Sequence, residues 1–472
     1  MDNFIQINIT DNHPEAPTIN REDCIRQMKD GSVRLLDTEY AKLFIAGNHV
    51  RFSNGAFYSP DGMCFPSEMK HTIALGLSDT ISQNIALYVD KVYNAIKYLT
   101  DEGEFRFQNR LIIPFKNGNL RVNLHGMWEF KEVHDDIQPV PYRLPVDFVP
   151  FHKNIPTPNF DKWINDLVEK EDIATIQEYL GYCLLPTTKV QKSLVLVGDG
   201  GLGKSILKKI LSSIFGKALI SPTDTSQFFQ DKFSLSDLEN KLVYYEDDLG
   251  DGNLENAGQF KKLVTNDDKI RAERKFENAY EFYPYARYII CGNDMFRAAN
   301  DNSLGFYRRL LAIHCKPKNP NRKDDPDLGA KISKEAEGIL QWILIGLKRV
   351  INNGWKVHES ERSKDYLQQY IRQADHFPEF FKDVFEEDEE SKITTNELVA
   401  AYNKWCVENG CTAVKDKVLK TYIINNGEKY HIYKCDNVYR DDNDGNRRHY
   451  RGYMGIRIKD EYAPKSINKI PI

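Results

Sequence analysis

Residues 198–205 read Gly198-Asp199-Gly200-Gly201-Leu202-Gly203-Lys204-Ser205, and they directly follow the apolar run 194–197. The apolar run predicts a buried strand, and the apolar spacing over 206–215, closed by Gly216, predicts an amphipathic helix. Glycines allow backbone N–H groups to surround an anion, and the N-terminus of the next helix favours negative charge. In such a loop a lysine binds phosphate and a serine hydroxyl binds Mg²⁺. We therefore predict an ATP-binding phosphate loop in which Lys204 and Ser205 have these roles.

Composition limits the class of protein. The chain has 472 residues, enough for several domains. It contains no apolar run of about 18 residues, and its first residues lack the features of a signal peptide, so we expect a cytoplasmic protein without a membrane span. Its 8 cysteines form no C-x-x-C pair, which fits a reducing compartment. With a net charge of -5, nucleic-acid binding would need local basic patches or an enclosed channel.

The sequence pattern divides the chain into segments. Strand-like and helix-like stretches alternate after the phosphate loop, which predicts an α/β fold with a parallel sheet covered by helices. A proline-rich stretch at 139–158 precedes two amphipathic helices, predicted at 160–170 and 173–185, and a further helix is predicted at 339–351. We expect an N-terminal α+β domain (1–145) of unclear role, a helical collar (146–190), a nucleotide-hydrolase core (191–325), a helical lid (326–362) and a C-terminal domain (363–472).

Within the N-terminal segment the pattern is β-like. The apolar runs 43–46 and 50–52 predict strands, and Asn54-Gly55 predicts a hairpin turn. No closely spaced pair of acids on a strand suggests a primase active site, so we predict no primase activity.

The C-terminal segment combines an acidic run with a helix–helix–hairpin pattern. The run 386–390 is entirely acidic and predicts a solvated loop or linker. Amphipathic helices at 395–408 and 415–424 are followed by a hairpin that turns at 443–445. This order of elements predicts a winged-helix-like domain.

A second apolar strand, predicted at 242–245, ends in acids. Glu246 and Asp247 come first off the strand, and Asp248 follows. Mg²⁺ favours oxygen ligands and keeps its own waters, and a second acid can polarise the attacking water. We predict that Glu246 binds Mg²⁺ and that Glu246 and Asp247 together support hydrolysis. Asp248 is the alternative candidate for these roles.

Two later strands end or begin in polar residues. Asn293 follows the apolar run 288–291, and an amide there could orient the water beside the γ-phosphate. Arg308 and Arg309 precede the apolar run 310–313, where an arginine could reach the nucleotide of a neighbouring subunit. A structural or surface role for these arginines remains open.

Between the acids and Asn293, residues 270–282 alternate apolar and polar types around Arg274, Lys275 and Phe276. This predicts a hairpin with a basic and aromatic tip. Such a tip suits single-stranded DNA, because lysine meets phosphate and an aromatic ring packs on sugar or base. A surface hairpin with ordinary solvated charges is an equal alternative for this segment alone.

Taken in chain order, the phosphate loop, the acids after the second strand, the basic hairpin, Asn293 and the arginine pair resemble the elements of superfamily 3 helicases. These helicases are hexameric AAA+ motors of small DNA viruses, phages, plasmids and mobile elements. The resemblance is strongest to the helicase part of phage, plasmid and poxvirus primase–helicases, and it covers about 110–425. It includes Asn117-Gly118-Asn119-Leu120 and Tyr179-Leu180-Gly181-Tyr182 before the motor, and 337–342 and 402–405 after it.

The resemblance implies roles for particular residues. It implies an AAA+ core, with Asn293 as sensor 1, Arg309 as the arginine finger with Arg308 second, and Arg274, Lys275 and Phe276 at the DNA-gripping tip. It also implies 3′-to-5′ unwinding by a ring that encloses one strand.

We therefore expect an ATP- and Mg²⁺-dependent DNA helicase that acts on single-stranded and forked DNA as a homohexamer, in the replication of a phage, plasmid or mobile element, with a primase or other replication protein as a further partner. Two alternatives stay open. One is an origin-binding initiator whose C-terminal hairpin (447–451) binds DNA, and the other is a P-loop enzyme of small molecules.

Overall fold

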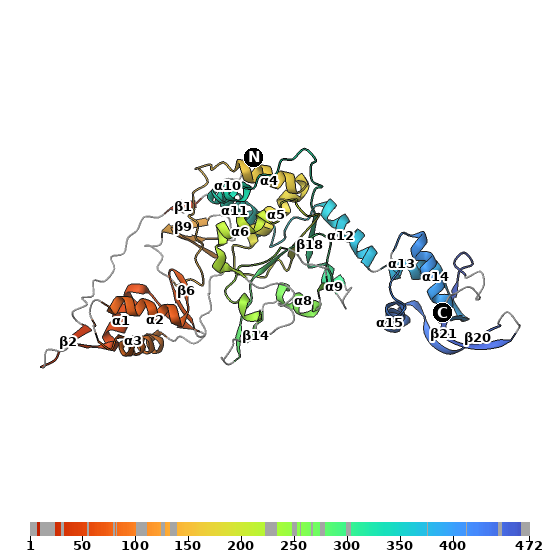
Figure 1. Cartoon of the computed structure of the whole chain (residues 1–472), viewed down its shortest axis with the longest axis horizontal. Helices are drawn as coiled ribbons and strands as arrows, with labels where there is room; N and C mark the ends of the chain where they lie inside the picture. Colours follow the sequence, from red (N-terminus) through yellow and green to blue (C-terminus); the bar gives the residue numbers. More distant parts are fainter. Residues whose placement is uncertain are drawn as a thin grey trace. The chain divides into compact units, whose positions relative to one another are not determined.

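The structure is a computed structural model with two compact units, Met1–Tyr366 and Leu367–Ile472, which are described separately below (Figure 1). It describes residues 7–9, 24–29, 33–53, 56–78, 81, 83–100, 111–123, 128–132, 139–221, 234–247, 253–254, 256–265, 268–273, 279–298, 304–374, 376–411, 413–441 and 446–463. Among these residues, no helix is long and apolar enough to cross a membrane.

The first unit is built on a five-stranded sheet in which every neighbouring pair is parallel. Its order is β11 (Ile220–Ser221), β12 (Val243–Glu246), β16 (Arg287–Gly292), β10 (Ser193–Val197) and β18 (Leu310–His314). The central strands are buried along almost their whole length, as expected for near-continuous apolar runs in a sheet covered on both faces. The predicted α/β fold with a parallel sheet is confirmed.

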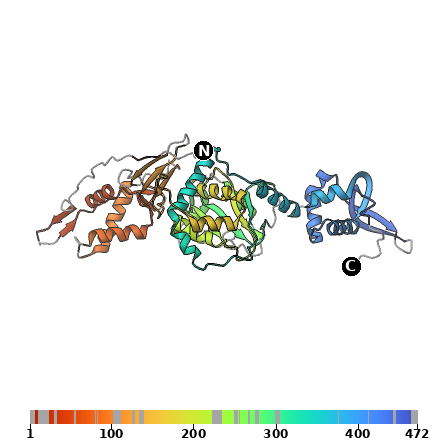
Figure 2. The ribbon, with the colours of Figure 1, turned by 90° about the horizontal axis from the view of Figure 1, so that it is seen from above.

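Helices cover both faces of this sheet (Figures 1 and 2). One face packs against α4 (Pro158–Leu167), α5 (Lys170–Tyr182), α6 (Ile206–Phe215), α10 (Leu328–Ser333) and α11 (Ala336–Asn352). The other face carries α8 (Ala257–Thr265) and α9 (Leu304–Tyr307). There the Phe260 ring of α8 lies 5.8 Å from that of Tyr288 and 5.7 Å from that of Phe306. The helices predicted around 160–170, 173–185 and 339–351 are all present.

Helices α5 and α11 cross at glycines. A Cβ at Gly346 would overlap the backbone of Gln177, and a Cβ at Gly181 would overlap the backbone of Ile343 and Leu347. Arg349 then ties the pair together, because its Nε donates to Glu178 Oε1 at 2.7 Å. The sequence pattern predicted both helices but not this contact, which only glycine permits.

Replacing Gly346 by alanine should therefore destabilise the first unit. The added methyl group has backbone rather than a flexible side chain in its way, and overpacking of this kind costs about 1–3 kcal/mol. Chemical denaturation measures the loss of unfolding free energy. Gly354→Ala is not a suitable control, because φ is +64° there. Gly47→Ala is suitable, because nothing lies within 4 Å of its added Cβ, and it should change stability little. Equal stability of the two variants would contradict the close crossing.

The N-terminal part of this unit has a helical core of its own. It contains α1 (Asp37–Asn48), α2 (Pro66–Leu77) and α3 (Ile85–Thr100), with the short strands β2 (Ile25–Gln27), β3 (Val33–Leu35), β4 (Arg51–Ser53), β5 (Ala56–Ser59) and β6 (Gly62–Cys64). The strand predicted at 43–46 is wrong: this run lies inside α1, which buries Tyr40, Ala41 and Phe44 at helical spacing. The strand predicted at 50–52 corresponds to β4, whereas Asn54-Gly55 lies outside the described residues.

A second, four-stranded sheet connects this part to the large core. Its order is β1 (Ile7–Ile9), β9 (Trp128–Glu132), β8 (Gly118–Arg121) and β7 (Ile112–Phe115). Phe115, Leu120 and Phe130 belong to the same hydrophobic cluster as the face of the five-stranded sheet that α6 covers. Three short pairs complete the unit, namely β13 (Asn253–Leu254) with β17 (Arg297–Ala298), β14 (Ile270–Ala272) with β15 (Tyr280–Phe282), and the bridge between Ser59 and Val140.

The helix α12 (Glu361–Ala374) spans the boundary to the second unit. That unit contains α13 (Phe377–Val384), β19 (Phe385–Thr394), α14 (Thr395–Glu408), α15 (Asp416–Asn426), β20 (Tyr433–Asp441) and β21 (Arg447–Ile458). Its antiparallel sheet has the order β19-β21-β20, and it packs with the three helices around an aromatic core that includes Phe380, Tyr402 and Trp405. The two helices and the hairpin strands predicted for this segment are present, and the turn at 443–445 lies outside the described residues.

The acidic run 386–390 is not a loop, so that prediction is wrong. It forms the first half of β19, where Glu386 pairs with Arg457 and Glu387 pairs with Ile456 of β21. The run can be a strand because it lies at the edge of the sheet, with most of its acids exposed and Phe385 and Ile393 buried at its ends. Charges on an edge strand also prevent its pairing with another chain.

Candidate nucleotide-binding site

The loop 198–205 connects the carboxyl end of β10 to α6, as predicted. Gly201 and Gly203 have φ angles of +77° and +97°, a conformation that residues with a Cβ rarely adopt. At Gly198 the reason for glycine is different, because an added Cβ would lie 2.9 Å from that of Cys315. The glycines therefore serve both the curvature of the loop and its close approach to the strand end beside it.

Lys204 lies inside this loop and is only 8% exposed. Its Nζ donates to the carbonyl oxygen of Gly198, to that of Asp199 at 3.1 Å and to Asn293 Oδ1 at 3.4 Å. The Lys204 ammonium is therefore buried rather than solvated. Asn293 follows β16, so the structure brings together the tip of that strand and the loop after β10.

Glu246, the last residue of β12, and Asp247, directly after it, point to opposite faces of the sheet, because side chains alternate along an extended chain. The Tyr245 hydroxyl donates to Asp247 Oδ1 at 2.9 Å and lies 3.3 Å from the Lys204 carbonyl oxygen. The Tyr244 hydroxyl donates to Glu246 Oε2 at 3.3 Å on the face that α8 covers. Asp247 is therefore on the side of the phosphate loop. Asp248 lies outside the described residues.

Burial keeps the groups beneath the loop protonated. It raises the pKa of the Cys291 thiol to about 12 and that of the Cys315 thiol to about 12. Burial also raises the pKa of Tyr245 far above its usual range, with Cys291 and Asp247 adding to the effect. Tyr245 is thus a fixed O–H donor to Asp247, and neither thiol offers a thiolate nucleophile at neutral pH.

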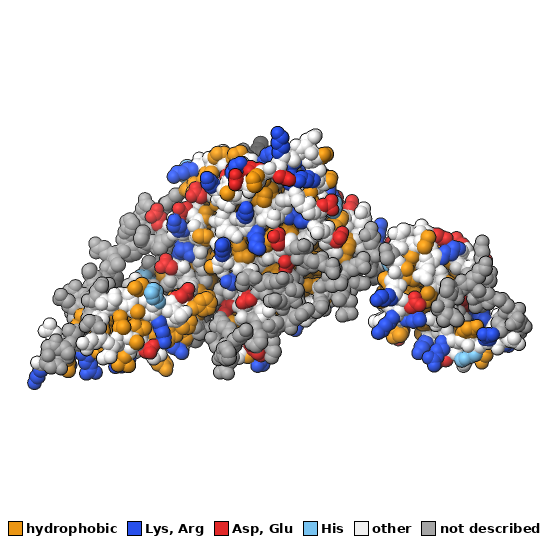
Figure 3. Space-filling view, in the orientation of Figure 1, with side chains coloured by type: hydrophobic (Ala, Val, Ile, Leu, Met, Phe, Trp, Pro, Cys, Tyr) orange, Lys and Arg blue, Asp and Glu red, His pale blue; other side chains and the backbone are white. Residues whose placement is uncertain are grey.

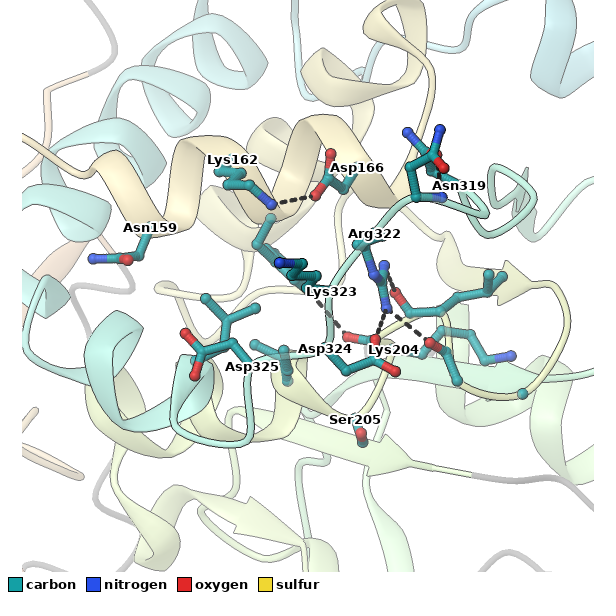
Figure 4. Close-up of a pocket in the computed structure, with 18 of the residues that line it drawn as sticks. Asn159, Lys162, Asp166, Lys204, Ser205, Asn319, Arg322, Lys323, Asp324 and Asp325 are labelled. Carbon is teal, nitrogen blue, oxygen red and sulfur yellow. Dashed lines mark hydrogen bonds and ion pairs between the residues drawn. The ribbon is translucent and has the colours of Figure 1, made fainter.

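A cavity of about 1060 Å³ opens over the phosphate loop (Figure 4). Besides the loop, it is lined by the predicted site residues Asp247 and Asn293. Ile206 of α6 also lines it, and the rest comes from α4 and from the segment between β18 and the start of α10, namely Asn159, Lys162, Trp163, Asp166, Asn319, Asn321, Arg322, Lys323, Asp324, Asp325 and Leu328. Sequence reasoning assigned no binding role to either of these two elements.

Helix α4 contacts the phosphate loop through Trp163, and its first turn is held by Glu335. Trp163 Nε1 donates to the Gly203 carbonyl oxygen at 3.0 Å. Glu335, just before α11, accepts from the backbone N–H groups of Asn159 at 3.1 Å and Phe160 at 2.9 Å. The amphipathic pattern of α4 predicted a core role for Trp163, but nothing in the pattern indicated that its ring nitrogen reaches the loop.

Arg322 connects the segment after β18 to the phosphate loop. Its Nη1 donates to the Leu202 carbonyl oxygen at 3.0 Å and its Nη2 to that of Gly201 at 2.8 Å. The same guanidinium lies 3.4 Å from Asp324, whose pKa is lowered by Lys318 first and by Arg322 second. Figure 4 shows Arg322 beside Lys204 at one side of the cavity, with Asn159 and Asp325 toward the other. A lone arginine after a strand carries no sequence signal for this role.

Arg322→Ala should weaken ATP binding about 10- to 150-fold, because two charge-assisted hydrogen bonds that shape the loop are lost, at a cost of about 1.5–3 kcal/mol. Arg322→Lys should recover only part of the affinity, since an ammonium does not span both carbonyl groups. Titration with a fluorescent ATP analogue measures the Kd. Lys334→Ala, which removes an exposed cation just after α10 that is not part of the cavity lining, is the control. Unchanged affinity in Arg322→Ala would show that its contacts to the loop do not matter for binding.

The two predicted arginines before β18 have different surroundings. Arg309 donates to the Gly305 carbonyl oxygen, and its Nη2 lies 3.5 Å from Thr265 Oγ1 of α8. Its own carbonyl oxygen accepts from the backbone N–H of Ser193 on β10 at 2.7 Å. The side chain of Arg308, in contrast, is exposed. Arg309 is thus bound within its own chain, while Arg308 faces outward.

The hairpin predicted at 270–282 is present as β14 and β15, with Arg271 opposite Glu281. Tyr280 lies opposite Ala272 at the end of the stem nearest the tip, and its hydroxyl donates to Glu239 Oε2 at 2.9 Å. The tip residues Arg274, Lys275 and Phe276 lie outside the described residues.

The site suits a nucleotide with Mg²⁺ better than a metal ion alone. No group of three or more His, Cys, Asp or Glu side chains in the described part of the chain is placed to hold a metal. Mg²⁺ is commonly bound by one or two protein oxygens together with phosphates and waters. The exposed Ser205, at the N-terminus of α6, and Asp247 in the cavity provide that kind of donor set.

Comparisons with known proteins match two parts of the chain. Residues 196–309 match a family of unknown function, DUF5906. Residues 372–453 match the Poxvirus D5 protein-like family. No curated protein matches the chain.

Among solved structures, the apo structure of the NrS-1 C-terminal region has a TM-score of 0.50 and 14% identity, over 90% of this chain and 100% of that one. A second structure of that region, the A form, has a TM-score of 0.46 and 15% identity, over 79% and 80% of the two chains. At this identity the first likeness concerns the fold alone.

Proposed function

We propose that this chain is an ATP-dependent DNA helicase that works in the replication of a phage, virus, plasmid or mobile element. One observation carries the proposal: the ends of three neighbouring parallel strands place Lys204, Asp247 and Asn293 around one cavity. A lysine in a glycine loop, an acid and an amide are what an ATP hydrolase needs beside the γ-phosphate.

In this proposal the loop N–H groups and Lys204 bind the phosphates, and Mg²⁺ supplies charge neutralisation. Ser205 and Asp247 would hold the ion. This gives Asp247 the metal role first assigned to Glu246, because Tyr245 directs Asp247 toward the loop while Glu246 is on the opposite face. Asn293 orients the attacking water, and Asp248 is the candidate to polarise it. Arg308, exposed just before β18, is a better candidate than Arg309 for a contact to a neighbouring subunit's nucleotide.

Two observations support DNA replication rather than small-molecule chemistry. The match of 372–453 to the Poxvirus D5 protein-like family agrees with the resemblance to poxvirus-type primase–helicases. The stem of the β14–β15 hairpin is formed, with its basic and aromatic tip between the acids and Asn293 in the chain. We propose that six copies form an AAA+ ring in which Arg274, Lys275 and Phe276 grip one strand, moving 3′ to 5′.

Replacing Lys275 and Phe276 together by alanine should abolish unwinding of forked DNA. Each subunit loses a phosphate contact and a packing contact, and base stacking alone is worth about 1–3 kcal/mol in comparable sites. Basal ATP hydrolysis should survive, because none of the described residues that line the nucleotide cavity comes from β14 or β15, while its stimulation by DNA should disappear. A strand-displacement assay and an ATPase assay measure both effects.

Arg271→Ala is the matched control, because it removes one positive charge from the stem of the same hairpin rather than from its tip. It should keep most of the unwinding rate. If the double variant unwinds as fast as the unaltered protein, the hairpin is an ordinary surface turn and the helicase proposal loses its DNA contact.

A further inference from the structure

The C-terminal unit presents a basic surface that ATP hydrolysis does not explain. One part is the exposed side of α15, which carries Lys417, Thr421 and Ile424 at helical spacing. Ile424 is 72% exposed although it is apolar, and Val418 on the same helix is 48% exposed. In Figure 3, Lys and Arg side chains gather on the part of this unit that α15 occupies in Figure 1.

The other part is the outer face of the β20–β21 hairpin. Tyr439 lies opposite His449, and their ring centroids are 5.4 Å apart. The Arg447 guanidinium lies 5.0 Å from the centroid of the Tyr439 ring, and His449 Nε2 lies 3.2 Å from Asn437 Oδ1. Arg451 follows on the same face, because alternate residues of a strand share a side. These exposed groups are therefore held in place by one another.

The inner face of the same hairpin is anchored on the helices. Arg440 donates from Nε to Glu397 Oε1 at 2.8 Å and from Nη2 to Glu397 Oε2 at 3.0 Å. Glu397 also accepts from the backbone N–H of Thr394 at 2.7 Å and so fixes the start of α14. This network holds the hairpin to α14, and α15 packs into the same hydrophobic core through Leu419 and Ile423.

Acidic and basic side chains are unevenly distributed over the sheet of this unit. The exposed acids of β19 lie at one edge of the sheet, whereas β20 forms the other edge. At the acidic edge Glu386 is partly neutralised by Arg457 at 3.5 Å. The hairpin end of β21 carries Arg447, Arg448 and Arg451 within five residues, and Asp436 of β20 lies 3.8 Å from Arg451. Such a local cluster of positive charge favours contact with a polyanion.

We propose that α15 and the outer face of the β20–β21 hairpin form a binding surface for duplex DNA. The major groove accepts an α-helix or a two-stranded ribbon, and Ile424 and Thr421 offer methyl groups of the kind that contact thymine. β20 has nine residues and runs about 30 Å from its start near α15, close to one turn of duplex, about 34 Å. The surface acts independently of the nucleotide cavity, and it goes beyond the proposed motor by giving the chain a second, double-stranded DNA contact.

The test uses the full chain and a blunt DNA duplex without single-stranded ends. The variant combines Lys417→Gln, Arg447→Gln and Arg451→Gln, all at exposed positions. The control removes the same charge elsewhere in the unit with Arg372→Gln, Lys382→Gln and Arg457→Gln. Fluorescence anisotropy at several salt concentrations gives the affinity and its salt slope, and thermal melting verifies that both proteins fold.

We expect the variant to bind the duplex at least about tenfold more weakly and to lose about 0.9 of salt slope for each phosphate contact removed. The control should bind as the unaltered protein does. Equal loss in variant and control, no loss in either, or no duplex binding by the unaltered protein would each overturn the proposal. So would a loss confined to single-stranded DNA. ATP hydrolysis should be the same in all three proteins, so failure here is distinct from failure of the motor.

Discussion

Lys204→Ala should reduce ATP hydrolysis at least about 100-fold, the scale that loss of one preorganised contact to developing charge produces. Lys204 is the one positively charged side chain held inside the phosphate loop itself, and its Nζ also contacts Asn293 at the tip of β16. Turnover measured with saturating ATP and Mg²⁺ tests the expectation.

The same substitution should lower stability as well, because Lys204 is buried and donates to two loop carbonyl groups. A cost of about 1–3 kcal/mol is expected. Lys204→Met keeps the aliphatic part of the side chain and separates loss of charge from loss of packing. Lys217→Ala, an exposed lysine just beyond α6, is the control and should leave both turnover and the thermal midpoint unchanged. Near-normal turnover in Lys204→Ala would refute the nucleotide site.

The second large effect concerns the two arginines before β18. Rings made only of Arg308→Ala subunits should lose about 10³-fold in hydrolysis, the lower end of the range for an arginine supplied in trans, while ATP binding and folding persist. When these subunits are mixed with Asp247→Asn subunits, some interfaces pair an intact Asp247 with an intact Arg308. Part of the activity should therefore return, and the ATPase assay across mixing ratios measures it.

Arg309→Ala is the matched comparison at the adjacent residue. It should lower the thermal midpoint, because it breaks the contacts to Gly305 and Thr265 within the chain. Its defect should not be rescued by mixing. If Arg309→Ala is rescued and Arg308→Ala is not, Arg309 is the arginine that acts in trans, as the sequence predicted. If mixed rings form and neither is rescued, no arginine of this pair acts in trans.

Prediction from the sequence was most successful where one pattern determined both the type of an element and its position in the sheet. The phosphate loop, its strand and its helix follow from glycine spacing and apolar periodicity, and the parallel sheet follows from the alternation after it. In the N-terminal segment, a short apolar run at 43–46 did not distinguish strand from helix, and the buried face of α1 decided it. At 386–390, composition predicted a loop, but pairing with β21 made it a strand.

In the candidate site, too, the sequence predicted residues that have a local pattern and missed those that depend on tertiary contacts. Lys204, Asp247 and Asn293 were predicted because each follows an apolar strand. Arg322 and Trp163 were missed, because each reaches the loop through tertiary contacts that leave no spacing in the sequence. The sequence could not tell which of Glu246 and Asp247 faces the phosphate loop, because this depends on the strand, which places adjacent side chains on opposite faces.

The central claim is that this chain is a ring motor that encloses DNA. Electron microscopy of the full-length protein with a non-hydrolysable ATP analogue, Mg²⁺ and forked DNA tests it most directly. We expect six-membered rings with DNA through the centre, ATP analogue beside Lys204, and the β14–β15 hairpins directed into the channel. Particles that remain monomeric with nucleotide bound, or rings that carry DNA only on their outer surface, would contradict it.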